Sequence, residues 1–112
     1  MSAVDEKTIF VSVMCVNNET GAIMPVSEIF SAVKEKYPDV ICHTDAVQAF
    51  GKIALNSKKL GANLISVSAH KVHAPKGVGA LYIKKGVRIV PRQYGGEQEK
   101  KIRSGTEALP LI

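Results

Sequence analysis

The sequence predicts part of an α/β fold, a fold in which helices cover both faces of a mostly parallel sheet and give three layers. Residues 8–14, 40–44 and 64–67 are short runs rich in apolar and β-branched side chains, as is typical of buried parallel strands. A segment with helical spacing lies between the first two runs. A strand, a helix and a second strand in this order predict a right-handed βαβ unit.

The first strand and helix are indicated by distinct patterns. Residues 8–14 are apolar or β-branched on both faces, which suits a central strand. Pro25 fits the first turn of a helix, where the missing N–H of proline costs nothing. Pro38 ends this helix. The apolar side chains between the two prolines form one stripe: Val26, Ile29, Phe30, Val33 and Tyr37.

The second half of the chain predicts a short helix and further strands. Asn56 is typical of an N-cap and Gly61 of the residue just past a helix end. Residues 79–83 are apolar and follow the strand at 64–67 after a loop too short for a parallel crossover, so we expect an antiparallel strand. The remaining expectations are a short strand at 87–90, a polar loop at 94–106 and the start of a helix at 107–112.

Residues 1–112 are predicted to form a single, partial domain. No repeat, linker or low-complexity segment divides them. Two helices cannot cover both faces of a sheet of four or five strands. No element precedes the first strand, and the last residues stop within what looks like a starting helix. We therefore expect the central segment of a larger domain.

Composition and charge exclude several classes of function. The formal net charge is +5, but the basic residues are spread along the chain and the few aromatic residues are not interleaved with them. This pattern argues against a nucleic-acid-binding surface and favours a site for an anionic cofactor or substrate. No apolar run approaches the ~20 residues of a membrane helix. We thus predict no nucleic-acid partner and no membrane association.

The N-terminus and the cysteines predict a cytoplasmic protein. The first residues lack the basic and then apolar pattern of a signal peptide. Cys15 and Cys42, the two cysteines, both lie within apolar runs. We expect buried, reduced thiols rather than a disulfide.

The chemically most informative stretch is the end of the third strand. Residues 66–71 read Ser-Val-Ser-Ala-His-Lys, and a loop containing proline and glycine comes next. A lysine is costly to bury beside a strand, because its charged amine must find a partner or lose its proton. A lysine with a lowered pKa can form a Schiff base, and pyridoxal phosphate offers the aldehyde for it. The alternative is that Lys71 is a solvated loop residue and its neighbours satisfy local backbone groups.

Other polar side chains are expected at the same edge of the sheet, because parallel strands place their carboxyl ends together. Asp45 comes directly after the second strand, and a carboxylate there would keep a pyridine nitrogen protonated. Gln48 could donate to the phenolic oxygen of such a ring. Taken singly, Asp45 is better explained as a helix N-cap and Gln48 as a solvated helix residue, whereas their combination with a lysine at a strand end favours a cofactor site. The edge is predicted to collect Asn17, Asn18, Asp45, Gln48, Ser66, Ser68, His70 and Lys71; no metal site is predicted.

The sequence resembles the cysteine desulfurases, which are class V aminotransferase-like enzymes with the type I pyridoxal-phosphate fold. The resemblance covers the chain from about residue 8 onward and rests on five ordered motifs. The Asn-Asn-Glu-Thr-Gly and Arg-Ser-Gly-Thr segments point to desulfurases, or to the related selenocysteine lyases. The motifs lie at residues 13–21, 43–48, 66–71, 75–82 and 103–106.

The resemblance implies a role for several matching residues. Lys71 would hold pyridoxal phosphate covalently and later move the α-proton of the substrate. Asp45 would pair with the pyridinium and Gln48 with the phenolic oxygen. Ser68 and His70 would bind the phosphate.

The resemblance also implies partners. Thr106 would reach the phosphate of the neighbouring subunit in a homodimer, and Asn18 would lie near the cofactor oxygen and the substrate carboxylate. L-cysteine would become L-alanine, with its sulfur passing to an enzyme cysteine as a persulfide. A sulfur-acceptor protein would then take the sulfur for iron–sulfur or thio-cofactor assembly.

Other family features have no counterpart between residues 1 and 112. They are the sulfur-accepting cysteine, the arginine for the substrate carboxylate and the histidine that stacks on the cofactor ring. Cys15 stands where the family usually has histidine or tyrosine. We therefore expect no desulfuration by this chain alone. The alternatives are another class V enzyme, such as a selenocysteine lyase, and a truncated non-catalytic paralogue.

Overall fold

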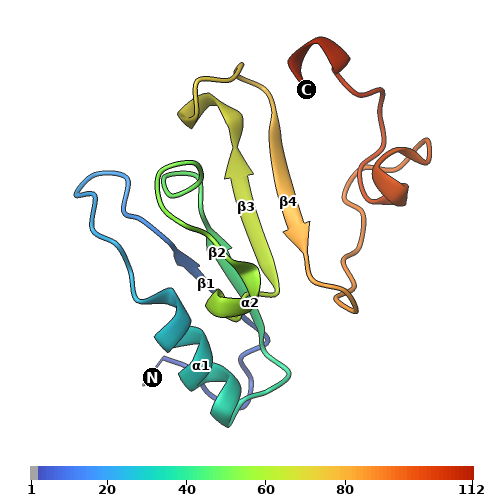
Figure 1. Ribbon diagram of the computed structural model, residues 1–112. Coiled ribbons are helices and arrows are strands. Elements are labelled where there is room, and N and C mark those ends of the chain that lie inside the picture. Colours follow the sequence, from blue (N-terminus) through green and yellow to red (C-terminus); the bar gives the residue numbers. More distant parts are fainter. Residues whose placement is uncertain (1–2) are drawn as a thin grey trace.

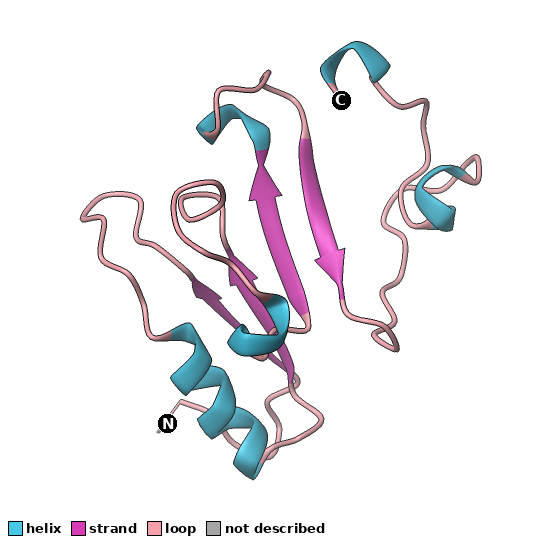
Figure 2. Ribbon diagram, viewed as in Figure 1, coloured by secondary structure: helices cyan, strands magenta, loops and turns pink. Residues whose placement is uncertain are grey.

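A four-stranded mixed sheet forms the centre of the protein in a computed structural model that describes residues 3–112 (Figures 1 and 2). The strands are β1 (Phe10–Met14), β2 (Ile41–Asp45), β3 (Leu64–Ser68) and β4 (Gly79–Ile83). They lie in the order β1-β2-β3-β4. β1 and β2 pair in parallel, as do β2 and β3, whereas β3 and β4 are antiparallel. The predicted mixed, mostly parallel sheet is confirmed.

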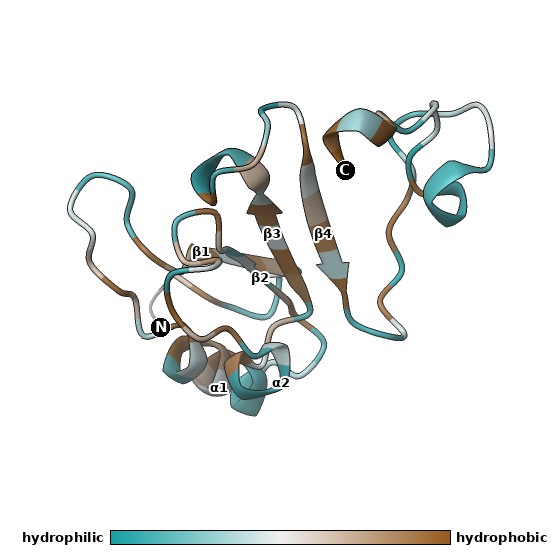
Figure 3. Cartoon of the chain, turned by 45° about the horizontal axis from the view of Figure 1, so that its top comes forward, coloured by the Kyte–Doolittle hydropathy of each residue, from teal (hydrophilic) through white to brown (hydrophobic). Residues whose placement is uncertain are grey.

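The helices lie together on one face of the sheet (Figure 3). They are α1 (Val26–Lys36) and α2 (Ser57–Leu60). Three short 3₁₀ turns occur further along the chain: η1 (Ala69–Lys71), η2 (Gln98–Lys101) and η3 (Leu109–Leu111). The opposite face carries no helix from residues 3–112, so a third layer is not formed within this part of the chain. Nor does any helix in it combine the length and apolar composition needed to cross a membrane.

The hydrophobic core lies between the sheet and α1. Phe30 and Val33 on α1 are fully buried, and they meet a sheet face that includes Cys42 and Ile65. Cys15, at the end of β1, belongs to the same cluster. Burial raises the pKa of both thiols, although Lys34 partly opposes the effect at Cys42. The prediction of buried, unpaired cysteines is confirmed.

The short helix α2 has the two ends that its sequence predicts. Asn56 Oδ1 accepts hydrogen bonds from the backbone N–H groups of Lys58 and Lys59, each at 3.0 Å. Gly61 ends the helix in the left-handed region, with φ of 67°. A helix of only four residues cannot be stabilised by its own hydrogen bonds alone. Its caps therefore contribute much of its local stability.

Replacing Asn56 with alanine is expected to lower the free energy of unfolding by about 1 kcal/mol, because two helix N–H groups lose their acceptor. Denaturant unfolding of the two proteins would measure the difference. Ser57→Ala is the matched control, since no hydrogen bond to the Ser57 side chain caps the helix. Equal stabilities of Asn56→Ala and Ser57→Ala would contradict the capping role.

Two predicted elements are wrong. Residues 87–90 are not a strand: β4 ends at Ile83, a turn closes as Val87 N–H donates to the Lys84 carbonyl at 3.0 Å, and no described strand pairs with residues 87–90. Residues 107–112 do not begin an α-helix and contain only η3. Pro110 disfavours the α conformation for the residue before it.

Candidate functional site

The carboxyl ends of β1, β2 and β3 meet at one edge of the sheet, as the parallel pairing predicts (Figure 1). Met14, the last residue of β1, lies opposite Asp45, the last residue of β2, and Asp45 lies opposite Ser66 of β3. The strand ends and the loops that leave them carry all but one of the predicted site residues. The expected edge is therefore formed.

The end of β3 brings a hydroxyl and an imidazole together. Ser68 Oγ lies 2.8 Å from His70 Nδ1 and 3.5 Å from the carbonyl oxygen of Val78. The Ala69 N–H donates to the same carbonyl at 3.1 Å, which fixes η1 to the chain just before β4. Ser68 is half-buried and His70 is exposed. The pair thus presents hydrogen-bonding groups to solvent at the sheet edge.

The close contact between β3 and β4 depends on a glycine. A Cβ at Gly79 would lie 2.7 Å from the carbonyl oxygen of Val67, which is closer than a real Cβ can approach. Any larger residue would push β4 away from β3. Gly79 therefore helps to fix the loop that contains Lys71.

Lys71 ends η1 and its side chain is exposed. Lys71 is not buried beside the strand, because η1 carries the residue away from the sheet, and its exposure agrees with the alternative of a solvated loop residue. The chain then turns sharply: the N–H groups of Val72 and Ala74 donate to the Ala69 carbonyl at 2.9 and 3.2 Å. His73 adopts a left-handed φ of 64° in this turn, a costly conformation that is enriched at functional sites.

Asp45 is held in place at the end of β2. Its Oδ1 accepts the N–H of Val47 at 2.9 Å, and its backbone carbonyl accepts the N–H of Cys15 at 2.7 Å. Val47 makes the one hydrogen bond to this carboxylate from residues 3–112. The second carboxylate oxygen therefore has capacity for a further donor. Gln48 is half-buried, and its Oε1 lies 3.5 Å from the amine of Lys52.

The turn after β1 separates the roles of two neighbouring asparagines. Asn17 Oδ1 accepts the N–H groups of Glu19 and Thr20, both at 2.9 Å, and the Thr20 hydroxyl at 3.1 Å. Asn17 is therefore a turn-forming residue. Asn18 is exposed at the carboxyl end of β1, where the sequence predicts it.

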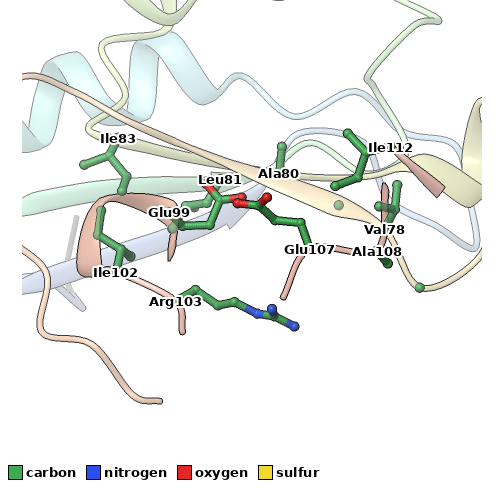
Figure 4. Close-up of a pocket in the computed structure, with 12 residues that line it drawn as sticks. Val78, Ala80, Leu81, Ile83, Glu99, Ile102, Arg103, Glu107, Ala108 and Ile112 are labelled. Carbon is green, nitrogen blue, oxygen red and sulfur yellow. The ribbon is translucent and has the colours of Figure 1, made fainter. Parts of the chain in front are cut away.

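Thr106 is the predicted site residue that does not join this edge. It is exposed on the segment that runs along the outer side of β4 (Figure 1). A groove of about 580 Å³ lies between that segment and β4, with Leu81 and Ile83 facing Ile102 and Glu107 (Figure 4). None of the predicted site residues lines this groove. The groove and the polar edge are therefore separate features.

His43, which the sequence patterns did not assign to the site, lies beside it. Its Nδ1 is 2.7 Å from Ser12 Oγ and its Nε2 is 3.2 Å from Ser66 Oγ. Burial lowers the pKa of the imidazole, and the Asp45 carboxylate partly opposes this. The available signal was that His43 and Asp45 are two residues apart in one strand and so share a face.

The chemistry of this side-chain set fits pyridoxal phosphate. A hydroxyl and an imidazole suit a phosphate, a carboxylate with spare acceptor capacity suits a protonated ring nitrogen, and an exposed amine suits an aldehyde. These groups belong to Ser68, His70, Asp45 and Lys71. The fit rests on two observations, the close Ser68–His70 pair and the single hydrogen bond to the Asp45 carboxylate.

The chain belongs to the aminotransferase class-V family, whose sequence model matches residues 1–110. Within that family it is similar to cysteine desulfurases. A cysteine desulfurase of Nostoc sp. is 50% identical over 105 residues, which are 94% of this chain and 26% of that relative. The chain spans about a quarter of the length of the curated relatives it matches.

Solved structures with the same fold carry related names. A NifS-like protein superposes with a TM-score of 0.94 at 49% identity, and the match covers 98% of this chain and 30% of that one. A structure described as SspA in complex with cysteine gives a TM-score of 0.92 at 37% identity, covering 98% and 32%. The predicted family membership and the mostly parallel α/β fold are confirmed.

Proposed function

We propose that this chain is the cofactor-binding segment of a pyridoxal-phosphate-dependent cysteine desulfurase. The reaction would convert L-cysteine to L-alanine: the carbon–sulfur bond breaks, and the sulfur joins an enzyme thiol as a persulfide. The observation that carries the proposal is the sequence of groups at the end of β3, where the Ser68–His70 pair is followed directly by the exposed Lys71. The similarity to named cysteine desulfurases supports it.

Each residue at the sheet edge has a role that follows from the chemistry of its side chain. When bound, pyridoxal phosphate supplies an electron sink for a carbanion. Lys71 holds it by its aldehyde and moves the α-proton of the substrate. Asp45 holds the proton on the ring nitrogen, and Gln48 donates to the phenolic oxygen. Ser68 and His70 bind the phosphate through their hydroxyl and imidazole.

Two further residues act at the margins of the site. Asn18 is exposed at the carboxyl end of β1, where its amide is available to the substrate carboxylate and the cofactor oxygen. Thr106 lies on the far side of β4 and is also exposed. We assign it to the phosphate of a second subunit, which makes the functional form a homodimer.

The thiol that accepts the sulfur is neither cysteine of this chain. Cys15 and Cys42 are buried, and burial raises the pKa of each, whereas a sulfur-accepting thiol must be exposed and readily deprotonated. The acceptor is therefore another cysteine of the enzyme, from which a partner protein collects sulfur for iron–sulfur assembly. Two buried free thiols also fit a reducing compartment such as the cytoplasm.

The test is to supply the natural gene product with pyridoxal phosphate, L-cysteine and a thiol reductant, and to measure alanine and sulfide. We expect equal amounts of the two products, well above those formed by free pyridoxal phosphate. Residues 1–112 alone are expected to give only that background. Release of selenide from L-selenocysteine without activity on L-cysteine would instead identify a selenocysteine lyase. Absence of both activities from the natural product would contradict the proposal.

A further inference from the structure

His43 is held on three sides at the centre of the sheet. Its two ring nitrogens lie 2.7 Å from Ser12 Oγ and 3.2 Å from Ser66 Oγ. Phe10 stacks on the ring, with centroids 5.9 Å apart and planes inclined by 19°. A side chain with both nitrogens and one face engaged has little freedom to rotate.

The strand register connects this histidine to Asp45. Ser12 lies opposite His43 in the β1–β2 pair, and Asp45 lies opposite Ser66 in the β2–β3 pair. His43 and Asp45 are two residues apart on β2 and so share the sheet face that no described helix covers. Ser66 therefore touches the histidine and stands beside the carboxylate.

Asp45 is the one charged group that faces the ring from the described strands. The other strand residues on this face are uncharged: Phe10, Ser12, Met14, Ile41, Leu64, Ser66, Ser68, Gly79, Leu81 and Ile83. Burial lowers the pKa of the imidazole and outweighs the opposing effect of the Asp45 carboxylate. The lowered pKa favours the uncharged ring, in which one nitrogen can donate to a serine and the other can accept from one.

We propose that His43 is a positioning residue for Asp45: an uncharged imidazole, fixed between Ser12 and Ser66, that leaves the carboxylate free to pair with a cationic ring nitrogen. This inference rests on the proposed function, because that nitrogen belongs to the cofactor. A histidine that gained a proton would become a second cation beside the same carboxylate and would compete for it.

The direction in which protonation of His43 changes the affinity for pyridoxal phosphate can be stated. A bound cation at Asp45 disfavours the protonated histidine, so a protonated histidine disfavours binding of that cation by the same factor. Binding of pyridoxal phosphate is therefore strongest above the pKa of His43 and weakens as the pH falls through it. Removing the carboxylate removes the group that raises the pKa of His43, so the pKa falls further.

The first experiment is an NMR titration of labelled histidine side chains in the protein without added cofactor. The natural gene product is used, and the signal that is lost in His43→Gln identifies His43. We expect the pKa of His43 to be lower in Asp45→Asn than in the wild type and unchanged in Asp39→Asn, whose carboxylate is exposed in the turn after α1. Equal values in wild type and Asp45→Asn would overturn the coupling.

The second experiment measures the affinity for pyridoxal phosphate at about pH 7.5 and about pH 5.5, on either side of the range in which histidine titrates. The wild type should lose about five-fold more affinity on acidification than His43→Gln, at the lower end of typical coupling between two sites. Glutamine retains a donor and an acceptor for the two serines but does not gain a proton between these two pH values. His73→Asn is the control, because asparagine tolerates the left-handed backbone there. An equal loss in wild type and His43→Gln would overturn the proposal.

Two further outcomes keep the inference separate from the proposed function. If neither the wild type nor any variant binds pyridoxal phosphate, the proposed function fails. The difference in the pKa of His43 between wild type and Asp45→Asn then still decides whether His43 and Asp45 are coupled. If His43→Gln does not fold, Ser12→Ala takes its place. Ser12→Ala should change the relative populations of the two neutral tautomers of His43, as read from its NMR signals. Ser31→Ala, at an exposed position on α1, should not change them. No change in Ser12→Ala would count against the fixed imidazole.

Discussion

Lys71→Ala is expected to abolish both the covalent attachment of pyridoxal phosphate and the production of alanine from L-cysteine. Lys71 is the residue that η1 carries out from the end of β3, directly after the Ser68–His70 pair. An alanine has no amine to bind the aldehyde or to move the α-proton. Loss of a proton-transferring group alone typically costs a hundred- to ten-thousandfold, so we expect turnover to fall by at least about a thousandfold.

Borohydride reduction followed by peptide mapping tests the assignment directly. In the wild-type gene product the cofactor should be fixed to Lys71. Lys76→Ala is the matched control, because Lys76 is an exposed lysine in the same loop and should have no effect. A label on Lys76, or an active Lys71→Ala variant, would show that the wrong lysine has been assigned. Unchanged thermal unfolding of Lys71→Ala would confirm that the loss is chemical rather than structural.

The sheet was predictable because each of its parallel strands is a short run of apolar and β-branched residues. The apolar runs predicted at 8–14, 40–44 and 64–67 become β1, β2 and β3 with boundary shifts of one or two residues. The antiparallel β4 could be predicted from loop length alone, since a short connection cannot cross over to a parallel position. The caps of α2 were equally clear, because Asn56 and Gly61 each suit one position at a helix end.

The C-terminal predictions failed because local patterns do not specify a pairing partner. Residues 87–90 have a strand-like composition, but a strand forms only where a neighbour accepts its backbone hydrogen bonds. No described strand lies beside them. The sequence from 107 to 112 contains helix-forming residues, yet Pro110 restricts Leu109 and only η3 forms.

The edge residues could be predicted because parallel strands place their carboxyl ends together, and the positions of Asp45, Ser68 and His70 obey that rule. The exposure of Lys71 could not be predicted in this way, because η1 turns the chain away from the sheet. The contacts of His43 could not be predicted from the sequence either. They depend on the register between three strands, which no single run of residues reveals.

Asp45→Asn is expected to lower turnover by at least about a hundredfold, the scale of a lost proton-handling group, while changing cofactor occupancy only a few-fold. The carboxylate and the amide have nearly the same shape, and asparagine Oδ1 can still accept the Val47 N–H that holds the turn at 2.9 Å in the wild type. The substitution removes the negative charge that would keep the ring nitrogen protonated. The substrate carbanion would then lack an electron sink, although Ser68, His70 and Lys71 would, on the proposed assignment, still bind the phosphate and the aldehyde.

Measuring occupancy and turnover on the same samples separates this role from a structural one. Occupancy is read from the absorbance of the bound cofactor, and turnover from alanine released per bound cofactor. Asp39→Asn controls for the change of net charge, because Asp39 is exposed in the turn after α1. If Asp45 only shaped the turn after β2, Asp45→Asn would resemble this control. Near-normal turnover per bound cofactor in Asp45→Asn would show that the charge of this carboxylate has no part in the chemistry.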